Sequence, residues 1–163
     1  MDQGDVSTTG AHHARLLLIF FGFTQCPDVC PTALARAVEV MKLLGPQAGQ
    51  LQVVFVTVDP ERDTPALLAE YTRAFHPSFL GLHADLETTA ATAREFKVFY
   101  KKVPTGSSYT MDHTAMSYAF DREGRLRLAV RHEQTAAQVA EERVRGGLLL
   151  LAGEGDAEKV MGA

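Results

Sequence analysis

The chain has 163 residues and a mass of 17.8 kDa, which is the size of one ordinary domain. Its 16 basic and 20 acidic residues are interspersed and give a net charge of −4, so we expect no surface for nucleic acid. A hydrophobic fraction of 46% is enough for a core without a disulfide framework, and no segment approaches the ~20 apolar residues of a membrane span.

The predicted strands and helices alternate along the chain. Short apolar runs rich in β-branched and aromatic residues predict strands, and apolar residues at helical spacing predict helices. The strands are expected over 16–22, 51–58, 79–83 and 98–102, followed by a hairpin of 117–120 and 126–130. The helices are expected over 31–45, 65–75, 86–97 and 135–151, with Asp63 or Thr64 capping the second, and 104–108 is expected to be a loop.

This order of elements predicts the fold class. Strands that alternate with helices indicate an α/β domain, and the hairpin before the last helix makes the central sheet mixed. We expect a single domain over 1–163, with a core of about 14–152 and loose ends at 1–13 and 153–163. Residues 1–15 are acidic and polar and are no signal peptide, so the chain is either cytosolic or a soluble piece of an exported protein.

The only two cysteines, Cys26 and Cys30, lie where the first strand turns into the first helix. This position is the thioredoxin-like arrangement, and the amide groups of a helix start favour thiolate, so lowered pKa values are expected there. Residues four apart on a helix are within reach of a disulfide, and both sulfurs can also face one metal ion. The residues alone leave metal binding, disulfide formation and two inert buried thiols as alternatives.

Three blocks of the sequence resemble the SCO/SenC family of copper chaperones. The first is 21–32 (FGFTQCPDVCPT), and the second is 56–65 (VTVDPERDTP). The third is 112–114 (DHT) followed by 118–121 (YAFD) and 124–126 (GRL), and the similarity runs from about 14 to 152. The blocks stand in the order found in that family, which makes the resemblance far more specific than the cysteine spacing alone.

The resemblance implies a thioredoxin-like fold and one copper ion bound by Cys26, Cys30 and His113. It also implies a role in assembling the binuclear copper site of cytochrome c oxidase, with the copper-site subunit or another cuproprotein as partner. Members of the family are normally anchored at the periplasmic or outer face of a membrane, and a monomer is expected. Relative to the family, we expect this chain to lack the anchor and most of an N-terminal hairpin, and it carries Thr114 where Ser is frequent.

A thiol–disulfide oxidoreductase is the main alternative function. Cys26 and Cys30 would then be the catalytic pair, and only the copper chaperone requires His113. A peroxidase would need an activating base or arginine near its cysteine, and none is evident in this sequence. A structural zinc site would need a fourth ligand, so both functions are ranked far behind.

Three carboxylates each allow two interpretations. Asp112 either orients the His113 ring or is an exposed turn carboxylate, Asp59 either lines the site or shapes a turn, and Asp28 either tunes metal affinity or is a turn residue. Arg62 and Asp63 are expected to form a structural ion pair. Core or supporting positions are expected for Phe21, Phe23, Met111 and Met116, and surface positions for His76, His83 and His132.

Overall fold

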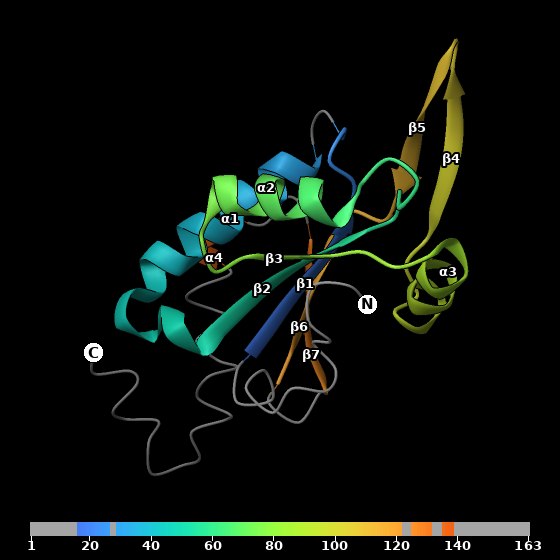
Figure 1. Ribbon diagram of the computed structural model, residues 1–163. Helices are drawn as coiled ribbons and strands as arrows, with labels where there is room; N and C mark the ends of the chain where they lie inside the picture. Colours follow the sequence, from blue (N-terminus) through green and yellow to red (C-terminus); the bar gives the residue numbers. More distant parts are fainter. Residues whose placement is uncertain (1–15, 27–28, 122–124, 132–134, 139–163) are drawn as a thin grey trace.

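A five-stranded sheet lies at the centre of the computed structural model, which describes residues 16–26, 29–121, 125–131 and 135–138 (Figure 1). The strand order is β3-β2-β1-β6-β7, and a separate two-stranded sheet consists of β4 and β5. The strands are β1 (Leu16–Gly22), β2 (Leu51–Thr57), β3 (Leu80–Leu82), β4 (Tyr100–Thr105), β5 (Ser108–His113), β6 (Met116–Phe120) and β7 (Leu126–Arg131). The helices are α1 (Val29–Leu44), the 3-10 helix η1 (Gly45–Gln50), α2 (Pro65–Phe75), α3 (Leu86–Glu95) and α4 (Ala136–Gln138).

The directions of the strands make the sheet mixed. β1, β2 and β3 are parallel, whereas β6 runs antiparallel to β1 and β7 antiparallel to β6. β1 is therefore paired on both sides, and every residue of β2 is buried, as expected for strands covered on both faces. The predicted thioredoxin-like α/β fold with a mixed sheet and a hairpin before the last helix is confirmed.

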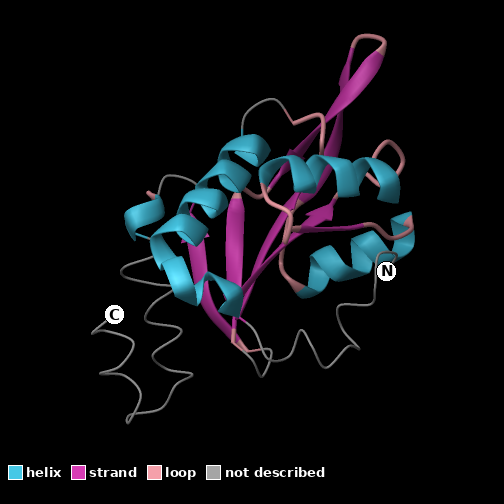
Figure 2. Cartoon of the chain, turned by 60° about the vertical axis from the view of Figure 1, so that its left-hand side comes forward, coloured by secondary structure: helices cyan, strands magenta, loops and turns pink. Residues whose placement is uncertain are grey.

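Helices cover both faces of the sheet (Figure 2). On one face, Tyr71 of α2 packs its ring 5.6 Å from that of Phe55 in β2. On the other face, Phe96 after α3 packs 5.3 Å from the ring of Phe21 in β1. Adjacent residues of a strand point to opposite faces, so Phe20 and Phe21 serve the two halves of the core.

Most predicted boundaries agree with the structure to within about two residues, which is the usual uncertainty of helix ends. α1 begins at Val29, two residues before the predicted start. Thr64 is the cap of α2, since its side chain accepts a hydrogen bond from the amide of Leu67 at 3.2 Å. Of the helix predicted over 135–151, only α4 falls within the described residues, and the expected ends 1–13 and 153–163 lie outside them.

The predicted loop at 104–108 is wrong. Pro104 and Thr105 end β4 and Ser108 begins β5, so the turn consists of Gly106 and Ser107, with Gly106 at a φ of 70°. The two strands are largely polar and form a hairpin that projects from the body (Figure 1). β4 lacks the alternation of apolar and polar residues that marks a half-buried strand, and its proline favoured a loop, so the alternation in β5 was not recognised. Within the described residues, no helix is long and apolar enough to cross a membrane.

Gly81 allows α2 to pack directly on β3. A Cβ atom at this position would lie 2.9 Å from Cβ and 3.1 Å from the carbonyl oxygen of Leu68, which is completely buried. We expect Gly81→Ala to lower the free energy of unfolding by about 1–3 kcal/mol, because the added methyl group must push the helix away from the strand. Urea unfolding followed by circular dichroism measures the change.

Gly49→Ala is the matched control, since a Cβ at Gly49 meets no atom within 4 Å and its φ is not in the left-handed region. This variant should be as stable as the wild type or gain up to about 1 kcal/mol. Equal unfolding midpoints for the two variants would contradict the close packing at Gly81.

Candidate metal centre

The two cysteines face one another across the start of α1. Cys26 follows the turn after β1, where its amide donates to the carbonyl of Phe23 at 3.2 Å. Cys30 is the second residue of α1, and its amide points at the Cys26 sulfur, with the nitrogen 3.4 Å from Sγ. The first amides of a helix have no partner within the helix, so this one is available to stabilise a sulfur. Both residues are thiols in the structure.

His113 comes from a part of the chain that is distant from the cysteines in sequence. It is the last residue of β5, and its Nε2 lies 3.4 Å from Sγ of Cys30. One donor atom from each of Cys26, Cys30 and His113 lies within 4.8 Å of the other two. The structure thus brings together the three side chains that the family resemblance singled out, and among the described residues no other group of this kind exists.

The tautomer of His113 follows from its second ring nitrogen. Nδ1 lies 3.1 Å from the carbonyl oxygen of Thr114. A carbonyl only accepts, so Nδ1 carries the proton, and in the neutral ring Nε2 has the lone pair that faces Cys30. Of the two interpretations of Asp112, the exposed carboxylate is the one that agrees with the structure, and the backbone of Thr114 orients the ring instead. Backbone carbonyls are common partners of ligand histidines.

Two aromatic rings pack against the His113 imidazole. Phe20 and Phe23 meet it edge to face, with ring centroids at 6.0 Å and 5.7 Å. Both phenylalanines are almost completely buried, and Phe23 packs beside the site as expected. Phe21 is also buried as expected, but it packs against Phe96 on the opposite face of the sheet. These rings limit the rotation of the imidazole and exclude water from one side of the site.

Gly22 provides the space for the Cys30 sulfur. A Cβ at Gly22 would lie 2.6 Å from Sγ of Cys30 and 2.9 Å from the ring of Phe20. Cys30 is fully buried, whereas Cys26 and His113 are half-buried. The site therefore has one enclosed sulfur and two ligand atoms that remain reachable from outside.

The expectation of a lowered cysteine pKa is wrong for Cys30 in the metal-free state. The pKa of this thiol is raised, first by its hydrogen bond with the Cys26 side chain and then by burial, which penalises the thiolate. The hydrogen bond to the Phe23 backbone acts in the opposite direction but is outweighed. The helix start is thus insufficient to ionise a cysteine that is removed from water. Metal binding must displace the Cys30 proton.

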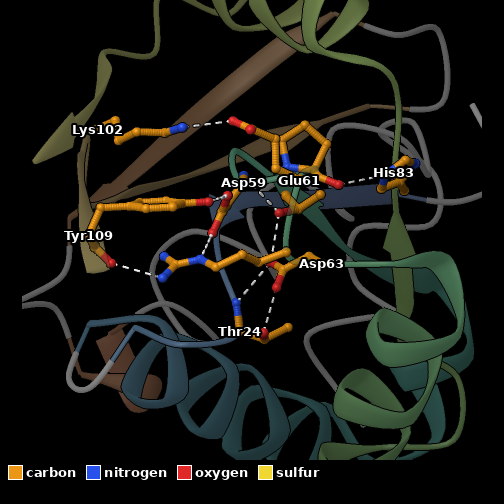
Figure 3. Close-up of polar contacts among 10 residues, drawn as sticks. Thr24, Asp59, Glu61, Asp63, His83, Lys102 and Tyr109 are labelled. Atoms are coloured by element: carbon orange, nitrogen blue, oxygen red, sulfur yellow. Dashed lines mark hydrogen bonds and ion pairs between the residues drawn. The ribbon is translucent and has the colours of Figure 1, made fainter. Parts of the chain in front are cut away.

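The loop after β2 connects the cysteine segment to the hairpin (Figure 3). Asp63, completely buried, accepts hydrogen bonds from the amide and hydroxyl of Thr24 and from the hydroxyl of Thr57. The predicted ion pair of Arg62 with Asp63 is wrong, because Arg62 pairs with Asp59, three residues earlier. Asp59 also accepts from the hydroxyl of Tyr109, at 2.8 Å. Burial and this hydrogen bond raise the pKa of Tyr109 to about 12, so its hydroxyl remains a donor at neutral pH.

The remaining candidates take no part in the three-residue group. Met111 is buried in the core and Met116 packs against it, as predicted. His76 and His83 are half-buried, with ring nitrogens near Ser78 and the carbonyl of Pro60, and Asp28 and His132 lie outside the described residues. Thr114 uses its hydroxyl to accept from the amide of Phe99 at 2.9 Å, which a serine could do equally well.

Sequence reasoning missed Thr24, Thr57 and Tyr109. Each contributes a hydroxyl to a carboxylate of the 59–63 loop, and a single hydroxyl residue carries no recognisable pattern in a sequence. The one available signal was the density of charged residues in that loop. Charged side chains that are buried near a sheet need hydrogen-bonding partners.

Alkylation can test the difference between the two cysteines. We expect iodoacetamide to modify Cys26 before Cys30 in the reduced, metal-free protein, because only thiolate reacts and Cys30 is buried with a raised pKa. Peptide mass spectrometry over a range of pH measures both rates. In Cys26→Ser the main cause of the raised pKa is gone, so Cys30 should react at lower pH than in the wild type. Equal rates at neutral pH in the wild type would contradict the enclosed position of Cys30.

Gly22→Ala should displace the Cys30 sulfur. We expect it to weaken Cu(I) binding by about tenfold or more, since ligand orientation is typically worth 10–100-fold in metal affinity. Competition with a chromophoric Cu(I) chelator measures the affinity, and Gly49→Ala is again the control. If the clash with the sulfur is the cause, Gly22→Ala should cost less stability in a Cys30→Ala background than in the wild type. Wild-type affinity in Gly22→Ala would show that the sulfur relocates freely.

Comparison with known proteins places this chain in a known family. The SCO1/SenC family model matches residues 1–145. The SCO2-like protein of Rickettsia felis is 38% identical over 129 residues, which cover 77% of this chain and 63% of that protein. The chain thus spans less than two thirds of the length of this curated relative.

Solved structures agree with the sequence comparison. Copper-bound ScoI of Bradyrhizobium japonicum has a TM-score of 0.73 and 42% identity, covering 80% of this chain and 84% of that one. Copper-bound yeast Sco1 has a TM-score of 0.73 and 31% identity, covering 83% and 77% of the two chains. The family match over most of the sequence, the identities above 30% and the shared fold show that this chain belongs to the SCO1/SenC family.

Proposed function

We propose that the protein binds one copper ion through Cys26, Cys30 and His113 and delivers it to the binuclear copper site of cytochrome c oxidase. The observation that supports this most directly is the grouping of the three donor atoms within 4.8 Å of one another. With metal–ligand bonds of about 2.0–2.3 Å at tetrahedral angles, as in zinc sites, donors around one ion lie about 3.3–3.8 Å apart. The separation of 3.4 Å between Cys30 Sγ and His113 Nε2 falls in that range.

The donor set matches copper in its chemistry. Two thiolates are soft ligands suited to Cu(I), and an imidazole extends the range to Cu(II). The lone pair of Nε2 already faces the sulfurs, so the histidine needs no proton transfer before it binds. The Cys30 thiol gives up a proton when it binds, and the resulting buried charge is offset by the cation.

Three protein ligands suit a protein that passes its ion on. They leave a coordination position open, and a ligand of the recipient can occupy it while the ion is still held. Because Cys26 and His113 are half-buried and Cys30 is enclosed, incoming ligands reach the ion from the side of Cys26 and His113. Transfer then proceeds by stepwise exchange of ligands, with Cys30 as the last protein ligand to leave.

Membership of the family supports a proposal for the partner and the location. A structurally similar protein is described as a member of the Sco family of cytochrome c oxidase assembly proteins. We propose the copper-site subunit of that oxidase, or another cuproprotein, as recipient, and the periplasmic or outer face of a membrane as the location. A monomer with a single thioredoxin-like domain is sufficient for the site, since all three ligands come from one chain.

Thiol–disulfide exchange is a second candidate function. Both cysteines are thiols whose sulfur atoms lie within 4.8 Å of one another, so a small movement can join them as a disulfide. In this function Cys26, the more exposed sulfur, would attack the partner, and Cys30 would resolve the mixed disulfide. His113 would not be required as a ligand.

His113→Ala separates the two functions. For the reduced wild type without oxygen, we expect one tightly held Cu(I) per chain in competition with a chromophoric chelator. Removal of a residue that only orients a metal ligand typically weakens metal binding by about 10–100-fold. Loss of His113 should weaken copper binding by more than this, because a ligand itself is lost. Oxidation of Cys26 and Cys30 to a disulfide should still proceed in this variant.

His76→Ala is the matched control, since His76 is half-buried near Ser78 and outside the three-residue group. Unchanged copper affinity in His113→Ala would remove this residue from the site. Stoichiometric copper that resists the chelator in Cys26→Ser would count against the whole site. Weak copper binding by the wild type, with rapid disulfide cycling, would favour the oxidoreductase.

A further inference from the structure

The hairpin that carries His113 is not part of the central sheet. β4 and β5 form their own two-stranded sheet, and the hairpin projects from the body of the protein (Figure 1). At its base, the amide of Thr114 donates to the carbonyl of Phe99 at 2.9 Å. The distance from His113 to the cysteines therefore depends on contacts between the hairpin and the body.

One face of β5 makes these contacts. Side chains of a strand alternate, so Tyr109, Met111 and His113 share a face. Met111 is buried in the core, and His113 faces the cysteines. Tyr109 lies four residues before His113 and is the one of the three nearest to the tip of the hairpin. Its side chain contacts a charged group of the body, the carboxylate of Asp59.

Tyr109 is held by both its side chain and its backbone. Its hydroxyl donates to Oδ1 of Asp59 at 2.8 Å, and its carbonyl accepts from Nη1 of Arg62 at 2.8 Å (Figure 3). The Arg62 guanidinium also lies over the ring, with Cζ 3.7 Å from the centroid, and its Nε donates to Asp59. Asp59 is almost fully buried, and the Arg62 side chain is 17% exposed. Arginine with a planar fork suits this combination of stacking and hydrogen bonding.

The same loop holds the cysteine segment. The carboxylate of Asp63 accepts from the amide of Thr24, two residues before Cys26, at 3.0 Å. The amide of Asp63 donates to the carbonyl of Asp59, also at 3.0 Å, so the two carboxylates belong to one tight turn. Residues 59–63 thus contact the cysteine half of the site through Asp63 and the histidine half through Asp59 and Arg62.

We propose that Asp59, Arg62 and Tyr109, here called the hairpin anchor, are positioning residues that hold His113 at bonding distance from Cys26 and Cys30. This inference rests on the proposed copper site, whose ligands it leaves unchanged. The anchor acts through the histidine: when it is broken, the hairpin reorients, the imidazole leaves the sulfurs, and the protein retains a two-thiolate site of lower affinity.

A thermodynamic cycle tests this inference. Cu(I) affinity is measured by chelator competition for the wild type, Arg62→Ala, His113→Ala and the double variant, with exposed Arg73→Ala in α2 as the matched control. We expect Arg62→Ala to weaken binding by about tenfold, within the range for residues that orient a ligand. In the His113→Ala background the same change should cost less than about twofold, because coupled residues are not additive.

Two further variants separate positioning from general stability. Tyr109→Phe keeps the stacked ring and the backbone contact and loses only the hydrogen bond to Asp59, so it should fold and weaken binding in the same direction by less. Arg62→Lys keeps the charge without the planar fork, and should restore part of the affinity lost in Arg62→Ala. A loss of melting temperature without a change in affinity would assign the anchor a structural role only and overturn the inference.

A readout without copper keeps this inference distinct from the proposed function. In the reduced, metal-free protein, the ring nitrogens of His113 give NMR signals that report the bond from Nδ1 to Thr114 and the proximity of Nε2 to Cys30. These signals should shift in Arg62→Ala and stay in place in Arg73→Ala. Unchanged signals, or equal losses of affinity with and without His113, would overturn the anchor. If the wild type binds no copper but the signals shift as expected, the anchor stands and the proposed function fails.

Discussion

The buried carboxylate of Asp63 is the interaction on which the arrangement of the site depends. It has no exposed surface, and a charge in that position is tolerated only if its oxygens are satisfied. Thr24 supplies an amide and a hydroxyl, and Thr57 a second hydroxyl. These donors belong to the segment after β1 and to the end of β2, so the carboxylate joins the ends of two parallel strands. The cysteine segment begins at that junction.

One of the three ligands is enclosed by the protein, and the other two are accessible from outside. Cys30 is buried against Gly22 and the core, and the imidazole of His113 lies between Phe20 and Phe23. The hydrogen bond with the Cys26 side chain and then burial raise the pKa of the Cys30 thiol, so it stays protonated until a cation replaces the proton. Cys26 and His113 remain half-buried, which leaves one side of the site open. A site with these properties can hold a soft cation firmly and still meet a partner.

Prediction from the sequence succeeded where a pattern reflects local physics. The apolar run of β1, the helical spacing in α1 and the Thr64–Pro65 start of α2 each depend on neighbours within a few residues, and the structure has them nearly as predicted. The end of β4 and the start of β5 were missed because Pro104 and Gly106 favoured a loop there, although Tyr109, Met111 and His113 alternate with polar residues along β5. The pairing of Arg62 was misassigned because adjacent residues on a tight turn point in different directions, and the partner Asp59 is reached by the turn itself.

The sequence by itself determined the fold class, the junction that carries Cys26 and Cys30 and, through its three motifs, the family and its expected ligands. Only the tertiary structure decided that Nε2 of His113 lies 3.4 Å from Cys30, 83 residues earlier in the chain. It also decided that the Cys30 pKa rises rather than falls, because the hydrogen bond with the Cys26 side chain and burial in the core outweigh the local effect of the helix start. Contacts between distant segments, such as that of Tyr109 with Asp59, depend on how the hairpin packs against the body. The spacing of residues along the chain does not determine this packing.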